Sequence, residues 1–191
     1  MAASQITRAD NLLFFDRVGA CARVEAMPYV KECCLDRVFF DQVVLTVEER
    51  TPVVTLLESN RLFELDAEGV VLRQLPADAV NPGPLVTNVP GLGYVEPGQR
   101  LSEAAVKAAL GVWGAFMGTS MAGDVTVSEL AAFGKNEVLM YCDELPFEIR
   151  WGRGDFAERA RRLDILWREK GGELPCTQYL DLRFDRDLAC E

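Results

Sequence analysis

Carboxylates and cysteines are the residue types that could carry chemistry in this 191-residue chain, since it contains no histidine. Histidine is the commonest general base and a common metal ligand, so Ser-His-Asp and Cys-His catalysis and an H-E-x-x-H zinc site are excluded. The 30 aspartates and glutamates leave a carboxylate-based hydrolase open as a hypothesis, although no glycine-framed acidic pair or nucleophile motif stands out. We therefore expect a protein that is not an enzyme and that uses no cofactor.

The six cysteines allow two interpretations. Their spacing contains no C-x-x-C pair, so it predicts neither a zinc knuckle nor a thioredoxin-type motif. We favour small buried apolar residues, a role that suits cysteine, because the spacing suggests no disulfide framework. The alternative is disulfides in an oxidising compartment, with Cys176 paired to another late cysteine. The cysteines are Cys21, Cys33, Cys34, Cys142, Cys176 and Cys190.

The formal net charge of -10 limits the partners that the protein can have. A surface that follows the phosphates of nucleic acid needs clustered lysine and arginine, so we expect no nucleic-acid partner. Attachment to anionic lipid through charge alone is disfavoured for the same reason. No stretch approaches the roughly 20 apolar residues of a membrane span, and the N-terminus lacks the order of a signal peptide. Taken alone, these features predict a cytoplasmic protein.

The hydrophobic pattern predicts an α+β chain with an antiparallel sheet. Helices are expected after a cap at Asp16, over residues 101–118 with Ser102 in the opening turn, and after Asp155. Asp155 and Glu158 form a capping box, which we prefer over an integrin-binding role for the Arg-Gly-Asp tripeptide that ends at Asp155. A region rich in proline and glycine connects the two halves of the chain over residues 76–98. Strands are expected over residues 30–38, 43–49, 53–57, 61–65, 70–72, 124–129, 136–142 and 147–151.

The C-terminal stretch QYLDLRFDRDLAC, residues 178–190, has the alternation of a half-buried strand. Leu180, Leu182 and Phe184 are predicted to face the core. This strand follows a helical crossover, so it need not pair with the strand before it. Its free edge would offer unpaired N–H and C=O groups to another chain. The alternative is that Phe184 is only a core residue and Arg183 only a solvated one.

Four passages, in order and covering nearly the whole chain, resemble the FtsQ/DivIB family of bacterial cell-division proteins. The first two are NLLFFD with PYVKECCLDRVF, and VVLTVEERTPVVTL. The others are ELDAEGVVL, and IRWGRGDFAERARRL with YLDLRFDRDLAC. The resemblance implies a partial POTRA-like domain over residues 1–57 and a mainly antiparallel β domain with two helices over residues 58–191.

The resemblance also changes the expected location. Family members carry a cytoplasmic tail and one membrane-spanning helix before the POTRA domain, so we expect the present sequence to be an N-terminally truncated piece. In its full-length form the protein would be anchored in the inner (cytoplasmic) membrane by one N-terminal helix. The present region would then lie on the periplasmic, extracytoplasmic side, at the division septum.

The implied function is that of a non-enzymatic scaffold that binds FtsB- and FtsL-like division proteins at a C-terminal sheet edge. The alternative is a POTRA-bearing module for outer-membrane protein assembly or secretion. The C-terminal half with its D-L-R-F sequence argues against this alternative, because POTRA repeats alone would not include that half. Glu49, Arg50 and Pro52 are expected to brace the domain junction, with a plain solvated Glu-Arg pair as the alternative. The expected partner-binding residues are Tyr179, Asp181, Arg183, Phe184, Asp185, Arg186 and Leu188.

Overall fold

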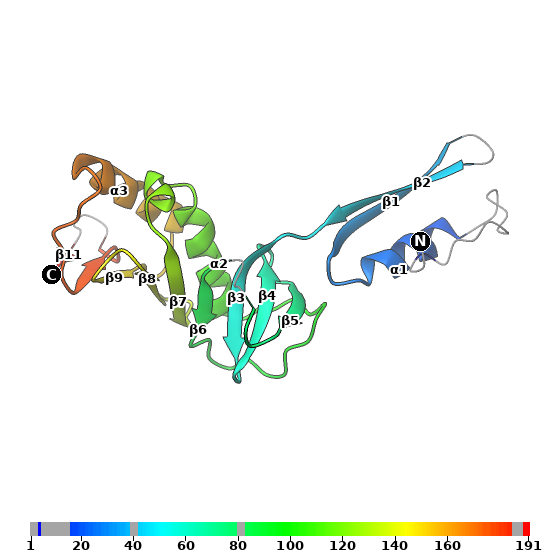
Figure 1. Ribbon diagram of the computed structural model, residues 1–191, viewed down its shortest axis with the longest axis horizontal. Helices are drawn as coiled ribbons and strands as arrows, with labels where there is room; N and C mark the ends of the chain where they lie inside the picture. Colours follow the sequence, from blue (N-terminus) through cyan, green and yellow to red (C-terminus); the bar gives the residue numbers. More distant parts are fainter. Residues whose placement is uncertain (1–3, 5–15, 39–41, 80–82, 185–188) are drawn as a thin grey trace.

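Two β-sheets lie toward opposite ends of an elongated molecule in the computed structural model, which describes residues 4, 16–38, 42–79, 83–184 and 189–191 (Figure 1). The first sheet has two strands and the second has nine. We call residues 16–49, with the two-stranded sheet, the N-terminal unit and residues 52–191 the C-terminal unit. None of the helices in the described ranges is long and apolar enough to cross a membrane.

The N-terminal unit is one helix packed on a hairpin. It consists of α1 (Arg17–Glu25), β1 (Val30–Val38) and β2 (Gln42–Glu49), and the two strands pair antiparallel. The helix begins where the sequence predicts, because the Asp16 carboxylate accepts a hydrogen bond of 2.8 Å from the Gly19 N–H. Among the described residues of this unit, Val24, Val30 and Cys33 form a buried cluster, with Cys21 and Leu45 packed against them.

The C-terminal unit is built on the nine-stranded sheet, in the order β11-β10-β9-β8-β7-β6-β3-β4-β5. Most neighbouring strands are antiparallel, but β3–β6, β6–β7 and β9–β10 are parallel pairs, and the predicted α+β class is confirmed. The strands are β3 (Pro52–Glu58), β4 (Arg61–Asp66), β5 (Val71–Leu75), β6 (Leu85–Thr87), β7 (Val127–Gly134), β8 (Glu137–Cys142), β9 (Glu148–Arg150), β10 (Tyr179–Asp181) and β11 (Ala189–Cys190).

Two helices complete the core of the C-terminal unit. The first, α2 (Ala104–Phe116), is apolar enough to be largely buried, and it contacts β7, β8 and α3 (Phe156–Glu169). Asp155 caps α3 as predicted, since its carboxylate accepts from the Glu158 N–H at 3.0 Å. Val112 of α2 and Leu163 of α3 are fully buried in the core of this unit.

Two predicted elements begin elsewhere. Ser102 does not open α2: the residue before the helix is Glu103, and its side chain makes no capping bond. The strand expected over residues 124–129 starts later, at Val127, because residues Ser120–Gly123 form a 3₁₀ turn, η1. The Asp124 carboxylate accepts a hydrogen bond of 2.8 Å from the Trp167 indole, which ties this turn to the end of α3.

The regular C-terminal strand predicted over residues 178–190 is wrong in its length, and its predicted alternation holds only in part: Leu180 and Leu182 are buried as predicted. The ladder ends at Asp181, whose side chain is buried, and Phe184 is 54% exposed instead of facing the core. The chain leaves the ladder because the Asp181 carboxylate accepts a hydrogen bond of 2.9 Å from the Arg183 N–H. The free edge expected on β10 is also wrong, since β9 pairs with one side of β10 and β11 with the other.

The preferred interpretation of the cysteines as unpaired buried residues is wrong for two of them. Cys176 and Cys190 form a disulfide, which was the alternative left open for Cys176. Sequence spacing does not show this pairing, because it arises when the chain turns back and places β11 beside β10. Of the four free cysteines, Cys33 and Cys142 are buried, as the preferred interpretation expects.

Candidate functional site

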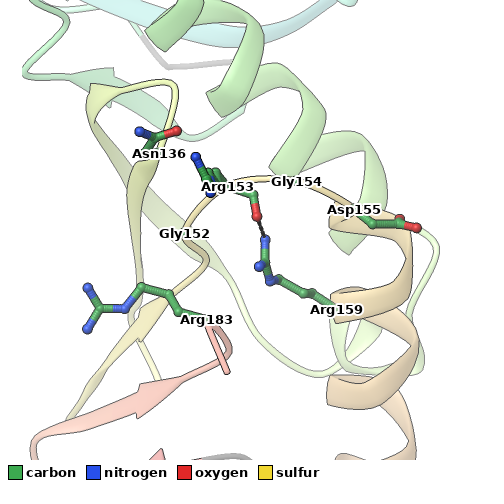
Figure 2. A pocket seen from close by; sticks show the side chains of 7 residues that line it. All are labelled: Asn136, Gly152, Arg153, Gly154, Asp155, Arg159 and Arg183. Carbon is green, nitrogen blue, oxygen red and sulfur yellow. Dashed lines mark hydrogen bonds between the residues drawn. The ribbon is translucent and has the colours of Figure 1, made fainter. Parts of the chain in front are cut away.

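A cleft of about 590 Å³ lies beside the segment that follows β10 (Figure 2). Its lining carries three arginines and one aspartate, so its local charge is opposite to that of the acidic chain as a whole. Such a surface favours contact with an acidic group. The lining residues are Asn136, Gly152, Arg153, Gly154, Asp155, Arg159 and Arg183.

Two arginines of α3 hold the segment that follows β10. Arg159 is buried and donates from Nε to the Leu182 carbonyl at 3.0 Å, and its guanidinium also donates to the Arg153 carbonyl. Arg162 donates to the Phe184 carbonyl at 2.8 Å. The backbone of residues 182–184 is therefore fixed from the helix side, although these residues belong to no strand.

Arg183 is held by a buried carboxylate. Its Nε and Nη2 atoms lie 2.9 Å and 2.6 Å from Asp181 oxygens, and the Asp181 side chain is only 3% exposed. Burial raises the pKa of Asp181, but the hydrogen bonds and charge of Arg183 outweigh it, so the net pKa lies below the ordinary value. The Arg183 side chain is itself 43% exposed and points away from Arg153 and Arg159 in Figure 2.

Gly152 makes room for this arginine. Its φ is +64°, a conformation that favours glycine, and a Cβ atom there would stand 2.5 Å from the Arg183 Cγ. A side chain at position 152 would therefore displace Arg183. This requirement is a consequence of the fold and has no local sequence signal apart from the glycine itself.

The remaining predicted partner-binding residues fall into two groups. Tyr179 is half-buried on β10, with the Arg150 guanidinium 3.9 Å from its ring centroid, and Phe184 exposes its ring at the end of the fixed segment. Asp185, Arg186 and Leu188 lie outside the described residues. The structure thus brings Tyr179, Asp181, Arg183 and Phe184 to the β11 end of the sheet.

At that end, β11 is the last strand in the sheet order. It contributes Ala189 and Cys190, which pair with Asp181 and Leu180. The Cys176–Cys190 disulfide fixes it from one side. A segment that extends the sheet would have to pair with this short strand, so most of its selectivity must come from neighbouring side chains.

The predicted junction residues occupy the boundary between the two units. Arg50 follows β2, and its Nη1 atom lies 2.6 Å from Asp66 and 2.7 Å from Glu68, both in the C-terminal unit. Pro52 begins β3, opposite Asp66, and Glu49 is an exposed residue at the end of β2. Arg50 therefore spans the boundary, whereas Glu49 pairs with Val30 inside the N-terminal unit.

Sequence reasoning missed a second contact across the boundary. The Tyr29 hydroxyl, from the turn before β1, donates to the Glu64 carboxylate on β4 at 2.5 Å. Arg73 on β5 binds both oxygens of the same carboxylate at 2.8 Å. Hydrogen bonds from Arg73 lower the pKa of Glu64, while burial and the Glu64 contact raise the pKa of Tyr29 to about 12. The one signal for this contact in the sequence was Glu64 itself, a glutamate inside a strand that is otherwise predicted to be buried.

Comparison with known proteins identifies both units. Residues 56–183 match the family model described as cell division protein FtsQ/DivIB, C-terminal, and residues 1–50 match the FtsQ-type POTRA domain. Among curated proteins, a cell division protein FtsQ of Syntrophotalea carbinolica is 24% identical over 98% of the chain. One of Rhodothermus marinus is 29% identical over 87% of the chain. The chain spans 66% and 62% of the lengths of these relatives, respectively.

Proposed function

We propose that this chain, which belongs to the FtsQ/DivIB family of cell-division proteins, is a non-enzymatic scaffold. It binds other division proteins at the β11 end of its sheet. The partners are FtsB- and FtsL-type bitopic proteins. The observation that carries this proposal is the fixed and exposed pair Arg183–Phe184. An arginine side chain held by Asp181 and an exposed aromatic residue on a fixed backbone, both beside a sheet edge, are residue types enriched at protein interfaces.

The contact surface offers two kinds of recognition. The Arg183 guanidinium presents a half-exposed positive group next to a cleft that also contains Arg153, so an acidic side chain of the partner is favoured there. The Phe184 ring, 54% exposed, provides apolar area for a partner side chain. Because α3 holds the Leu182 and Phe184 carbonyls and Asp181 holds the Arg183 side chain, little backbone entropy and little Arg183 side-chain entropy are lost when the partner binds.

The junction contacts support a role for the relative position of the two units. The resemblance implies a domain boundary after residue 57. We place the boundary at residues 50–52 instead, because β3 pairs with β4 and β6 inside the large sheet. Arg50 and Tyr29 brace this boundary through Asp66, Glu68 and Glu64. A scaffold that presents separate surfaces on each unit benefits from such bracing, since it fixes the distance between them.

The proposed location is the extracytoplasmic side of the cytoplasmic membrane, at the division septum. The Cys176–Cys190 disulfide supports it, because structural disulfides persist in oxidising compartments. An alkaline phosphatase fusion to the full-length gene tests the location. We expect an active fusion, and an inactive fusion beside an active cytoplasmic reporter would contradict the proposal.

The binding test must respect the internal pair of Arg183. Reversing its charge would place two carboxylates together, since Asp181 is buried beneath it, so loss of binding could reflect misfolding. The double variant Asp181→Asn/Arg183→Gln removes both charges together, so that neither is left buried without its partner. Asp181→Asn alone keeps the arginine and releases it from its internal partner.

We expect a peptide covering the extracytoplasmic segment of the FtsB homologue from the same genome to bind the wild type and Asp181→Asn. The double variant should bind at least tenfold more weakly while keeping its circular dichroism spectrum. Equal binding by the folded double variant would contradict the role of Arg183. The charge-reversed Arg61→Glu, on β4 at the other end of the sheet, serves as the control and should bind normally.

A further inference from the structure

The N-terminal unit contains a pair of cysteines in contact. Cys21 on α1 and Cys33 on β1 place their sulfur atoms 3.3 Å apart, and the two residues are 12 positions apart in the sequence. Both sulfurs lie in the small core that joins the helix to the hairpin, against Val24 and Val30. The short distance between the two sulfur atoms results from the packing of α1 on β1 and involves no sequence motif.

The two thiols differ in access. Cys21 is partly exposed and lines a groove of about 430 Å³ between α1 and β1, together with Arg17, Val18 and Leu35. Cys33 is buried, and burial and its hydrogen bond to Cys21 raise the pKa of its thiol to about 11. A reagent from solution therefore reaches Cys21 first, and Cys33 stands next to it in position for a second step.

Two further observations favour a covalent link here. Among the described residues, the buried cluster of the N-terminal unit contains only Val24, Val30 and Cys33, and small cores are often supplemented by a cross-link. The same chain already closes one disulfide, between Cys176 and Cys190, so it is compatible with an oxidising environment.

We propose that Cys21 and Cys33 form a second disulfide, which links α1 to β1 when the protein meets a disulfide-bearing oxidant. The Cys21 thiol loses its proton and attacks a sulfur of the oxidant, which releases one thiol and leaves a mixed disulfide. Cys33 then loses its proton and displaces the second thiol. Two protons and two electrons pass to the oxidant's disulfide, which leaves as two thiols.

The neighbouring Cys34 provides the matched control. It is exposed and points to the opposite face of β1, with its sulfur 3.8 Å from a Glu32 oxygen. A pairing of Cys21 with Cys34 would require the strand to turn over. The Cys34→Ser variant therefore keeps the proposed pair and removes the competing one.

Peptide mapping of the purified chain tests the proposal without any division partner, so its outcome is independent of the proposed function. The protein is treated with oxidised glutathione, unfolded, alkylated with iodoacetamide and digested with trypsin without reduction. Cleavage at Arg17, Arg23, Lys31 and Arg37 releases Cys21 in VGACAR and the Cys33–Cys34 pair in ECCLDR.

We expect a linked VGACAR–ECCLDR peptide in the wild type and the corresponding VGACAR–ECSLDR peptide in Cys34→Ser. The number of alkylated free cysteines should fall from four to two in the wild type. Oxidation should also raise the unfolding midpoint of Cys34→Ser but leave that of Cys21→Ser/Cys34→Ser unchanged. Full alkylation of Cys21 and Cys33 after treatment that leaves Cys176–Cys190 closed would overturn the proposal. A link that disappears in Cys34→Ser would also overturn it, because the pair would then be Cys21–Cys34.

Discussion

Replacing Arg50 by alanine should weaken the joint between the two units. The variant removes a guanidinium that lies 2.6 Å from Asp66, an ion pair whose side chains are 17% and 4% exposed. A hydrogen bond to a charged group contributes about 1.5–3 kcal/mol, and the second contact, to the more exposed Glu68, adds little. Asp66 keeps two backbone donors, the N–H groups of Glu68 and Val70, so its carboxylate is not left without partners. We therefore expect the free energy of unfolding of Arg50→Ala to be about 2 kcal/mol lower than that of the wild type.

The assay is urea unfolding monitored by circular dichroism, combined with small-angle X-ray scattering of the native state. The Arg50→Ala variant should unfold at lower urea, with the N-terminal unit separating from the C-terminal unit as a distinct step. Its scattering should also show a broader distribution of interatomic distances. Among the described residues, Tyr29–Glu64 is then the main remaining side-chain hydrogen bond across the boundary.

Lys31→Ala is the matched control. Lys31 and Glu48 approach within the same 2.6 Å, but both side chains are exposed and both belong to the N-terminal unit. We expect no measurable change in stability or scattering for this variant. If Arg50→Ala and Lys31→Ala behaved alike in both measurements, the bracing role of Arg50 would be wrong.

Three further predictions concern the β11 end of the sheet. Urea unfolding should show that Gly152→Ala lowers the free energy of unfolding by about 1 kcal/mol or more. The variant should also bind an FtsB-type segment more weakly, since the added methyl group displaces Arg183. Replacing Cys176 and Cys190 by serine removes a disulfide between residues 14 positions apart and should lower the free energy of unfolding by about 3 kcal/mol. Thermal unfolding with and without reductant measures this loss. The pKa of Asp181 is lowered in the folded state, so its ionised carboxylate stabilises the fold. This contribution is complete above the ordinary aspartate pKa of about 4 and is lost as the pH falls through the folded-state pKa. A plot of unfolding free energy against pH should therefore fall less steeply at acid pH for Asp181→Asn than for the wild type.

Local features of the fold could be predicted well from the sequence. The helices after Asp16 and Asp155 begin where predicted, because each aspartate caps its own helix within three residues. The hairpin of residues 30–49 was confirmed for a similar reason, since its β-branched pattern is local. The family resemblance, which rests on an ordered set of short motifs, was confirmed as well.

Two kinds of feature could not be predicted: side-chain contacts that override a periodic pattern, and contacts between distant parts of the chain. The alternation of residues 179–184 is typical of a strand, but the Asp181 carboxylate binds Arg183 and turns the chain out of the ladder. The Tyr29–Glu64 contact joins residues 35 positions apart, and no periodic pattern connects them. Of the candidate site, Arg183 was predicted from the sequence as a binding residue and stays a prediction, whereas the room that Gly152 leaves for its side chain has no signal in the sequence pattern.

Calorimetric titration of the chain with the extracytoplasmic segment of the FtsB homologue, for wild type and Phe184→Ala, tests the central claim most directly. If the exposed Phe184 ring anchors the partner, its removal should weaken binding by about 2 kcal/mol, roughly 30-fold, without changing the fold. Tyr94→Ala removes an aromatic ring that is 70% exposed and lies near Arg61, toward the β5 end of the sheet, and it should bind like the wild type. Equal affinities for wild type and folded Phe184→Ala, or no binding by the wild type, would contradict a partner-binding surface at the β11 end.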